Sequence, residues 1–159
     1  ICPYGYRKSA DGRMEPDEDV AGIVRQIFEW AADGNTAAEI TRKLYAMNIP
    51  TPGEYRRDKG KDHYNVSRTH GVWSSSTVLR MLEDQRYIGT YVIGKRKVQE
   101  IGSRRMKLKD ESEWFKIPDH HPAIVSMELF EKANASIRRF SLPNKKRRNY
   151  LLRGKVFCG

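Results

Sequence analysis

Apolar residues recur at helical spacing between positions 16 and 32, and this pattern predicts the first helix. Pro16 suits the first turn, and the acidic residues after it suit the positive end of a helix dipole. The turn at 33–35 contains Gly34 and ends the helix. The stripe expected to face the core consists of Val20, Ile23, Val24, Ile27, Phe28 and Ala31.

A second helix is predicted from Ala37 to Met47, because Thr36 and Glu39 have the spacing of a capping box. Ile40, Leu44 and Met47 would face inward. The following run, 48–53, holds two prolines and a glycine and should end the helix. Two helices joined by a short turn suit a helix-turn-helix variant and also any helical hairpin, which is the commoner arrangement.

The stretch 71–97 predicts a third helix followed by a basic strand. Trp73 is an aromatic anchor, and Ser74 or Ser75 can accept a backbone N–H at the start of a helix that would end near Asp84. Val78, Leu79 and Leu82 would form the apolar face, and Ser76, Arg80 and Glu83 the polar one.

A β-hairpin is predicted after this helix. Thr90 to Val98 is rich in β-branched and aromatic residues, Gly102-Ser103 suits the tip, and 113–117 would be the returning strand. Beside three helices, such a hairpin has the shape of a winged helix. The alternative is a solvated hairpin that touches no partner.

Three other segments complete the prediction. Ser126 would cap a last helix from Met127 to about Phe140, with Leu129, Phe130, Ala133 and Ile137 inward. The segment 54–70 lacks apolar periodicity, so we expect a mobile basic loop. Residues 1–15 would form an extended segment with a turn, docked through Tyr4 and Tyr6.

These elements predict an α+β fold that is mainly helical, with a helix-turn-helix or winged-helix-like core and a small antiparallel sheet. The expected units are a lead-in segment at 1–15, a domain at 16–140, and a basic linker with the first strand of another unit at 141–159.

The charge distribution favours a polyanionic partner. The chain contains thirty Lys and Arg residues and twenty Asp and Glu residues, which gives a net charge of +10. The segment 17–33 holds five acidic residues and one basic, whereas 138–155 holds eight basic residues and no acidic one. We therefore expect a polarised molecule.

Cysteine and histidine positions argue against a disulfide framework or a metal centre. Cys2 and Cys158 lie at opposite ends of the chain, which fits a reduced cytoplasmic setting. His63 and His70 lack partners at metal-ligand spacing, and adjacent His120 and His121 suit a turn better than a metal site. No apolar run approaches the roughly 20 residues needed to cross a bilayer.

Taken in order, several motifs resemble the recombinase domain of the large serine site-specific recombinases. The resemblance spans nearly the whole chain and depends on the order and spacing of the motifs together. They are Pro3–Tyr6, Ile23–Glu29 with Gly34, Glu39-Ile40, Leu44, Ile49–Pro52, Trp73, Val78, Leu79, Leu82, Tyr87–Gly89, His121–Val125, Phe130 and Leu151–Gly159.

The resemblance implies a non-catalytic DNA-binding domain that holds a separate catalytic domain at the crossover site. The family's nucleophilic serine lies in that upstream domain, so Ser74, Ser75 and Ser76 are not catalytic. Cys158 would be one ligand of a zinc ribbon further downstream, and this fragment should bind no zinc. The parent, from a bacterium, phage or mobile element, would act as a dimer on DNA and a tetramer in synapsis.

Candidate contacts to double-stranded DNA fall in five groups. The serine face and Arg80 would enter a groove, and the other basic residues would hold phosphates. The residues are Arg7, Lys8; Arg56, Arg57, Lys59, Lys61, Arg68; Ser74, Ser75, Ser76, Arg80; Lys95, Arg96, Lys97, Arg104, Arg105, Lys107; and Lys145, Lys146, Arg147, Arg148.

Two other functions fit parts of the pattern. One is the DNA-binding module of a winged-helix transcription regulator. The other is a metal-dependent nuclease that uses the histidines, which the lack of an acidic-histidine cluster disfavours.

Overall fold

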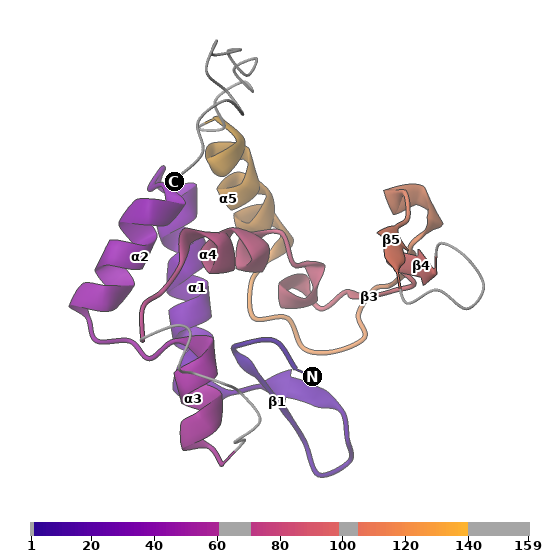
Figure 1. The fold of residues 1–159 in the computed structure, drawn as a ribbon, viewed down its shortest axis with the longest axis horizontal. Helices are drawn as coiled ribbons and strands as arrows, with labels where there is room; N and C mark the ends of the chain where they lie inside the picture. Colours follow the sequence, from indigo (N-terminus) through magenta and orange to yellow (C-terminus); the bar gives the residue numbers. More distant parts are fainter. Residues whose placement is uncertain (1, 61–70, 99–104, 140–159) are drawn as a thin grey trace, which may run out of the picture.

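The computed structural model describes residues 2–60, 71–98 and 105–139, and only the backbone of 138 and 139. The helices pack around one core, and a hairpin projects from it (Figure 1). The elements are β1 (Tyr6–Lys8), β2 (Met14–Pro16), α1 (Glu18–Ala32), α2 (Ala37–Ala46), α3 (Pro52–Asp58), α4 (Ser75–Leu82), the 3-10 turn η2 (Gln85–Ile88), β3 (Tyr91–Ile93), β4 (Arg96–Val98), β5 (Met106–Leu108), the 3-10 turn η3 (Glu111–Glu113), β6 (Phe115–Ile117) and α5 (Met127–Arg139).

Helix α1 is the centre of the core and confirms the first predicted helix. Val24, Ile27 and Phe28 are fully buried, as the apolar stripe requires. The start differs from the prediction, because Pro16 lies in strand β2 and Asp17 is the N-cap residue. The chain pairs as a strand up to Pro16, so the helix begins two residues later.

Helix α2 also forms as predicted. The Thr36 hydroxyl accepts a hydrogen bond from the Glu39 backbone N–H at 3.3 Å, and the Glu39 carboxylate accepts one from the Thr36 N–H at 2.7 Å. This capping box satisfies two backbone donors that the helix itself leaves unpaired. Ile40 and Leu44 are buried, whereas Met47 is 57% exposed, contrary to the prediction.

Helix α4 packs against α2 with a face slightly rotated from the expected one. Val78, Met81 and Leu82 are buried, and Leu79 is exposed. Residues 78, 81 and 82 follow the 3.6-residue period, whereas Leu79 falls one position beyond it. The predicted anchor is confirmed, because Trp73 is buried and its indole N–H donates to the Ile49 carbonyl at 2.9 Å.

Helix α5 lies along α1 and closes the core. Phe130 stacks on Phe28 with ring centroids 5.8 Å apart, and Ala133 is fully buried. Asn134 donates to the Leu82 carbonyl at 2.8 Å, which ties α5 to the end of α4. The predicted cap is confirmed, because the Leu129 N–H donates to the Ser126 hydroxyl at 3.3 Å.

The N-terminal segment is a hairpin, not merely extended chain. Strands β1 and β2 pair antiparallel, and Tyr4 and Tyr6 are buried against the helices, as predicted. Gly5 has φ of +94°, and a Cβ there would lie 2.6 Å from a Val24 methyl group. Only glycine allows the strand to approach α1 this closely.

The prediction of a loop over 54–70 is wrong in its first part, where helix α3 forms. The Thr51 hydroxyl accepts from the Glu54 N–H at 3.3 Å, and the Glu54 carboxylate accepts from the Thr51 N–H at 2.9 Å. Pro52 occupies the first turn, where its missing N–H costs nothing. The run 48–53, interpreted only as a stop, therefore also starts a helix.

The projecting hairpin is divided into two ladders. Strand β3 pairs antiparallel with β6, and β4 pairs antiparallel with β5. The predicted single strand over 90–98 is interrupted at Gly94, whose φ of +73° bends the chain. The predicted tip, Gly102-Ser103, lies outside the described residues. The α+β, mainly helical class is confirmed.

Candidate nucleic-acid interface

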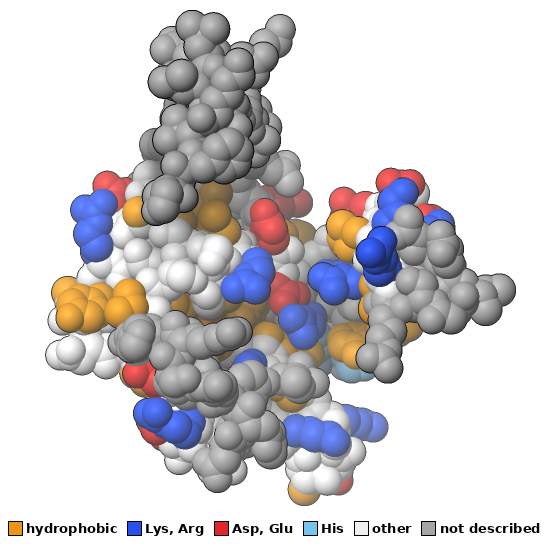
Figure 2. Space-filling view, viewed as in Figure 1, with side chains coloured by type: hydrophobic (Ala, Val, Ile, Leu, Met, Phe, Trp, Pro, Cys, Tyr) orange, Lys and Arg blue, Asp and Glu red, His pale blue; other side chains and the backbone are white. Residues whose placement is uncertain are grey.

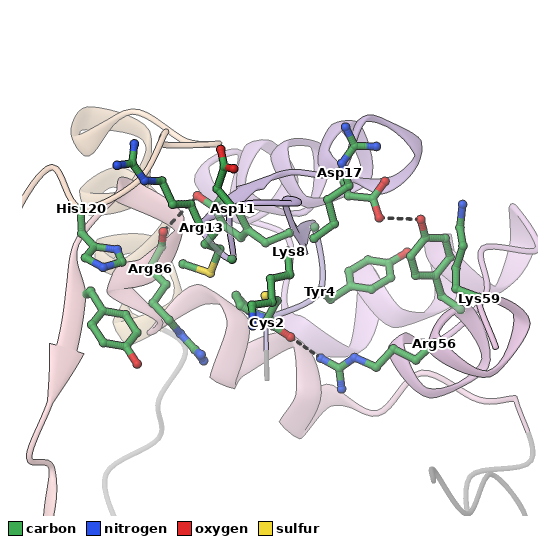
Figure 3. A pocket seen from close by; sticks show the side chains of 18 residues that line it. Cys2, Tyr4, Lys8, Asp11, Arg13, Asp17, Arg56, Lys59, Arg86 and His120 are labelled. Atoms are coloured by element: carbon green, nitrogen blue, oxygen red, sulfur yellow. Dashed lines mark hydrogen bonds between the residues drawn. The ribbon is translucent and has the colours of Figure 1, made fainter. Parts of the chain in front are cut away.

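A groove of about 770 Å³ opens between the β1–β2 hairpin, α3 and η2. Basic residues come to it from segments far apart in the sequence (Figure 3). Two acidic residues, Asp11 and Asp17, also line it. The six basic residues are Arg7, Lys8, Arg13, Arg56, Lys59 and Arg86. We call this the basic groove.

Intramolecular partners hold two of these basic side chains at the rim. Arg7 pairs with Glu15 at 2.8 Å, and the hydrogen bond raises the pKa of Arg7. Lys59 pairs with Asp19 at 2.7 Å, and the hydrogen bond likewise raises the pKa of Lys59. Both pairs are exposed, so each adds little stability and can open toward another anion.

The side chain of Arg56 is held by the N-terminal segment. Its guanidinium donates to the Cys2 carbonyl at 2.8 Å, which fixes α3 against the N-terminal segment. Arg57, also a predicted contact, points elsewhere: it is exposed, lies 3.7 Å from the Asp58 carboxylate and does not line the groove.

Within the described part of the chain, Lys8 and Arg13 have no acidic partner within salt-bridge distance. Both are exposed, and both come from the β1–β2 hairpin across the groove from α3. An unpaired cation loses no internal contact when it binds a phosphate. These two side chains are therefore the groove's readiest anion ligands.

Two of the tyrosines that line the basic groove, Tyr4 and Tyr55, have hydroxyl groups with raised pKa values. The Tyr55 hydroxyl donates to the Asp17 carboxylate at 2.7 Å, and burial raises the pKa of Tyr55. Burial also raises the pKa of Tyr4, whose buried hydroxyl has no hydrogen-bond partner among the described residues. Both phenols therefore stay neutral at physiological pH and add no negative charge to the groove.

Arg86 and His121 join the groove to the base of the hairpin. Arg86 pairs with Asp84 in a two-pronged contact, with its Nε atom 2.9 Å from each carboxylate oxygen. The His121 Nε2 atom lies 2.6 Å from the Arg86 carbonyl oxygen, and Tyr6 donates to the same carbonyl at 3.0 Å. Burial lowers the pKa of His121, so it is neutral near pH 7.

The exposed face of α4 carries a second set of predicted contacts. Ser74 is the N-cap, and its hydroxyl accepts from the Thr77 N–H at 3.2 Å. Ser76 and Arg80 are exposed, and the Arg80 Nε donates to the Ser76 carbonyl at 3.2 Å. Ser75 is half-buried. Capping occupies Ser74, and the Ser76 hydroxyl lies 3.0 Å from the Ser74 hydroxyl, so Arg80 is the side chain of this face best able to reach a base edge.

The hairpin carries a third set. Lys97 and Lys107 lie directly opposite each other in the β4–β5 ladder and therefore share one face. Arg96 lies opposite Leu108 on the other face, and Arg105 precedes β5. The Lys95 ammonium lies 4.9 Å from the Trp114 ring centroid, a cation–π contact that partly occupies it.

Ten residues from the sequence prediction lie outside the described part of the chain. They are His63, His70, Lys61, Arg68, Arg104, Lys145, Lys146, Arg147, Arg148 and Cys158. Among the residues that are described, no group of three or more His, Cys, Asp or Glu could hold a metal ion. No described helix is long and apolar enough to cross a membrane.

The sequence prediction missed Arg13 and Arg86. Arg13 follows the Asp11-Gly12 turn and stands next to Met14, which pairs with Lys8 across the hairpin. Interpreting that turn as a hairpin would have placed Arg13 beside Lys8. Arg86 belongs to a short 3-10 turn, and no spacing rule indicated that it would lie near β1.

Figure 2 shows one face of the molecule, on which Lys and Arg side chains lie over α2, α3 and the β1–β2 hairpin, between α4 and the projecting hairpin, and on that hairpin. Acidic side chains lie among them. The described part of the chain thus offers a basic groove, an exposed helix side and a basic ladder, and cations spread in this way can bind an extended polyanion.

The family is established by a match of the Recombinase family model to residues 18–140. The chain belongs to this family. It is also similar to a protein of Sinorhizobium fredii (strain NBRC 101917 / NGR234) described as "Uncharacterized protein y4bA/y4pH". The two are 27% identical over 174 residues, which cover 99% of this chain and 24% of that protein.

A solved structure shares the fold. It is the crystal structure of an LSR–DNA complex, that is, of a large serine recombinase with DNA. The TM-score is 0.54 at 13% sequence identity, and the match covers 86% of this chain and 31% of the other. The chain thus spans about a quarter of the curated relative and about a third of the solved one.

Proposed function

We propose that this chain is a sequence-specific DNA-binding domain of a serine site-specific recombinase. The observation that carries the proposal is the basic groove, where Lys8, Arg13 and Arg56 meet although they are distant in sequence. Duplex DNA is a polyanion that fits, because each phosphate neutralised by a Lys or Arg releases a condensed counterion and so adds to the affinity. Membership of the Recombinase family and the fold shared with a recombinase from a DNA complex support it.

The three sets divide the work of recognition. The groove and the Lys97–Lys107 ladder hold phosphates and set the register of the domain on the duplex. The exposed face of α4, with Ser76 and Arg80, reads base edges. The remaining predicted cations, including Arg104 and the 145–148 cluster, add contacts to the backbone.

The role of the whole protein follows from the same proposal. The domain positions a separate catalytic domain at the crossover site, where a serine attacks DNA, and itself takes no part in the chemistry. A zinc ribbon that includes Cys158 follows in the parent. The parent works in the cytoplasm as a dimer on one site and a tetramer in synapsis.

The phosphate contacts are tested by the salt dependence of duplex binding. Replacing both Lys8 and Arg13 by Ala should weaken binding to every sequence and reduce the slope of log affinity against log salt by about 2, at roughly 0.9 per phosphate contact. Arg42→Ala with Lys43→Ala on α2 removes the same charge away from the groove and is the matched control. Equal slopes for both double variants would refute the groove as a DNA surface.

Base reading is tested by comparing α4 with the hairpin. Arg80→Ala should reduce discrimination between cognate and scrambled duplexes by about 1–3 kcal/mol, the value of one good bidentate base contact. Lys97→Ala should instead weaken both duplexes equally, as should Arg104→Ala. If Arg80→Ala and Lys97→Ala reduce discrimination to the same degree, the assigned division between α4 and the hairpin is wrong.

A further inference from the structure

The projecting hairpin has an apolar side as well as a basic one. In the β3–β6 ladder, Tyr91 pairs with Ile117 and Ile93 with Phe115. Directly opposed residues and residues two apart share a face, so these four side chains form one surface. The intervening pair, Val92 and Lys116, lies on the other face.

The β4–β5 ladder has the same division. Val98 pairs with Met106, and Leu108 pairs with Arg96, so three apolar side chains share a face with one cation. The Lys97–Lys107 pair occupies the opposite face. We call the seven apolar residues on these two faces the hairpin apolar set: Tyr91, Ile93, Val98, Met106, Leu108, Phe115 and Ile117.

The hairpin apolar set is open to solvent. Phe115 is 72% exposed, Leu108 59% and Met106 58%. These seven residues are more than half of the large hydrophobic side chains that are exposed in the described part of the chain. Such a concentration on four three-residue strands is a mark of a surface that binds something.

DNA is a poor occupant for this set. Apolar side chains that enter DNA do so as single wedges between base steps. A broad apolar sheet face packed against phosphates would desolvate them without replacing their hydrogen bonds to water. The cations that suit phosphates, Lys97 and Lys107, lie on the opposite side of their ladder.

A second copy of the chain fits better. A two-fold contact brings the same patch of both copies together, so an apolar set can be buried against its own counterpart. The hairpin also carries both signs of charge, because Arg96 lies on the apolar side of β4–β5 and the turn η3 after β5 is acidic. Two copies can therefore meet without placing only like charges against each other.

The exposed area of the hairpin apolar set indicates under which conditions two copies would associate. At roughly 150–200 Å² for a large side chain that is about half exposed, the set offers on the order of 600 Å² per copy. A standard interface buries about 800 Å² per partner. The contact is thus too small to hold free copies of a chain with net charge +10 together.

Binding to one duplex removes that obstacle, because DNA neutralises the charge and raises the local concentration. Tyr91 lines the basic groove as well as belonging to the hairpin apolar set, so the set borders the proposed DNA surface. We propose that the hairpin apolar set docks against its counterpart on a second copy bound alongside on the same DNA. This inference rests on the proposed function.

Cysteine cross-linking of the full chain tests the contact. A chain of this length has a radius of gyration of about 15 Å, so one copy covers roughly 12 base pairs. In a background with Cys2→Ser and Cys158→Ser, Phe115→Cys should give cross-linked dimers on a duplex of about 40 base pairs and none on one of about 15. Lys116→Cys, one residue away on the opposite face, is the matched control and should give none on either.

Binding cooperativity supplies the second readout. On the longer duplex, the wild-type chain should bind its second copy at least about fivefold more tightly than its first, within the usual range of coupling. Ile93→Gln with Phe115→Gln, which adds no charge beside the proposed DNA surface, should abolish this coupling and leave affinity for the short duplex unchanged.

Each alternative outcome is distinct. Equal cross-linking at positions 115 and 116, or non-cooperative binding by the wild type, overturns the docking inference and leaves DNA binding intact. Loss of affinity for the short duplex in the double Gln variant shows that the set touches DNA, which also overturns it. If the wild type binds no duplex, the proposed function fails and the inference fails with it.

Discussion

The helical body and the projecting hairpin differ in where their apolar side chains lie. The body consists of α1, α2, α4 and α5, and the hairpin consists of β3 to β6. In the body, Val24, Ile27 and Phe28 are fully buried. In the hairpin, every residue of β4, β5 and β6 is exposed. The body gains its stability from removing apolar area from water. The hairpin keeps its side chains outside, where they can contact another molecule.

The hairpin therefore depends on other interactions. Its two ladders supply backbone hydrogen bonds, Lys95 lies over the Trp114 ring, and Lys116 pairs with Glu111 at 2.8 Å. Contacts of this kind each contribute little in water. The comparison teaches that substitutions in the body should change stability, and substitutions in the hairpin should change binding.

The largest expected effect comes from a matched pair of phenylalanines. Phe28→Ala removes a fully buried ring that contacts Tyr87 and Phe130, and should lower the free energy of unfolding by about 3–5 kcal/mol. Phe115→Ala on the hairpin should change it by less than about 0.5 kcal/mol. Urea denaturation measures both, and similar losses would show that the hairpin is part of the core.

A smaller effect is expected at the two capping boxes. Thr51→Ala and Thr36→Ala should each lower the free energy of unfolding by about 1 kcal/mol. Only Thr51→Ala should also weaken duplex binding, because α3 holds Arg56 and Lys59 in the basic groove. Denaturation and duplex titration separate the two effects. Equal loss of duplex affinity in both variants would remove the special role of α3.

The smallest expected effect is a pH dependence at the junction of body and hairpin. Burial lowers the pKa of His121 in the folded chain, so the unfolded chain binds more protons as the pH falls. Stability should therefore be complete above the unfolded value of about 6.5 and decline as the pH falls below it.

Thermal unfolding between pH 7.5 and 5.5 measures this decline. The window lies above the usual titration range of Asp and Glu, so histidine dominates it. His121→Gln should flatten the profile. An unchanged profile in His121→Gln would show that the decline has another origin.

The sequence predicted most of the body, because its helices carry a regular apolar period and local start signals. Thr36 with Glu39, and Ser126 with Leu129, act within one turn and could be found without the fold. The same rule applied to Thr51 and Glu54 would have revealed α3. The prolines beside them drew attention to where a helix ends and away from where one begins.

The groove could not be predicted in the same way. Lys8, Arg56 and Arg86 meet only because the β1–β2 hairpin packs across α1 toward α3 and η2. No local period encodes such a meeting. The two sides of the hairpin were hidden for a related reason, since the break at Gly94 shifts the alternation between β3 and β4.

The hydroxyl of Tyr6 donates to the carbonyls of Arg86 and Pro122, at 3.0 and 2.9 Å. Arg86 precedes β3 and Pro122 follows β6, so a single side chain clasps both legs of the hairpin where they leave the helices. A displacement of strand β1 would therefore be transmitted directly to the hairpin, because no loop between them absorbs it. A tilt of β1 would change the orientation of the hairpin.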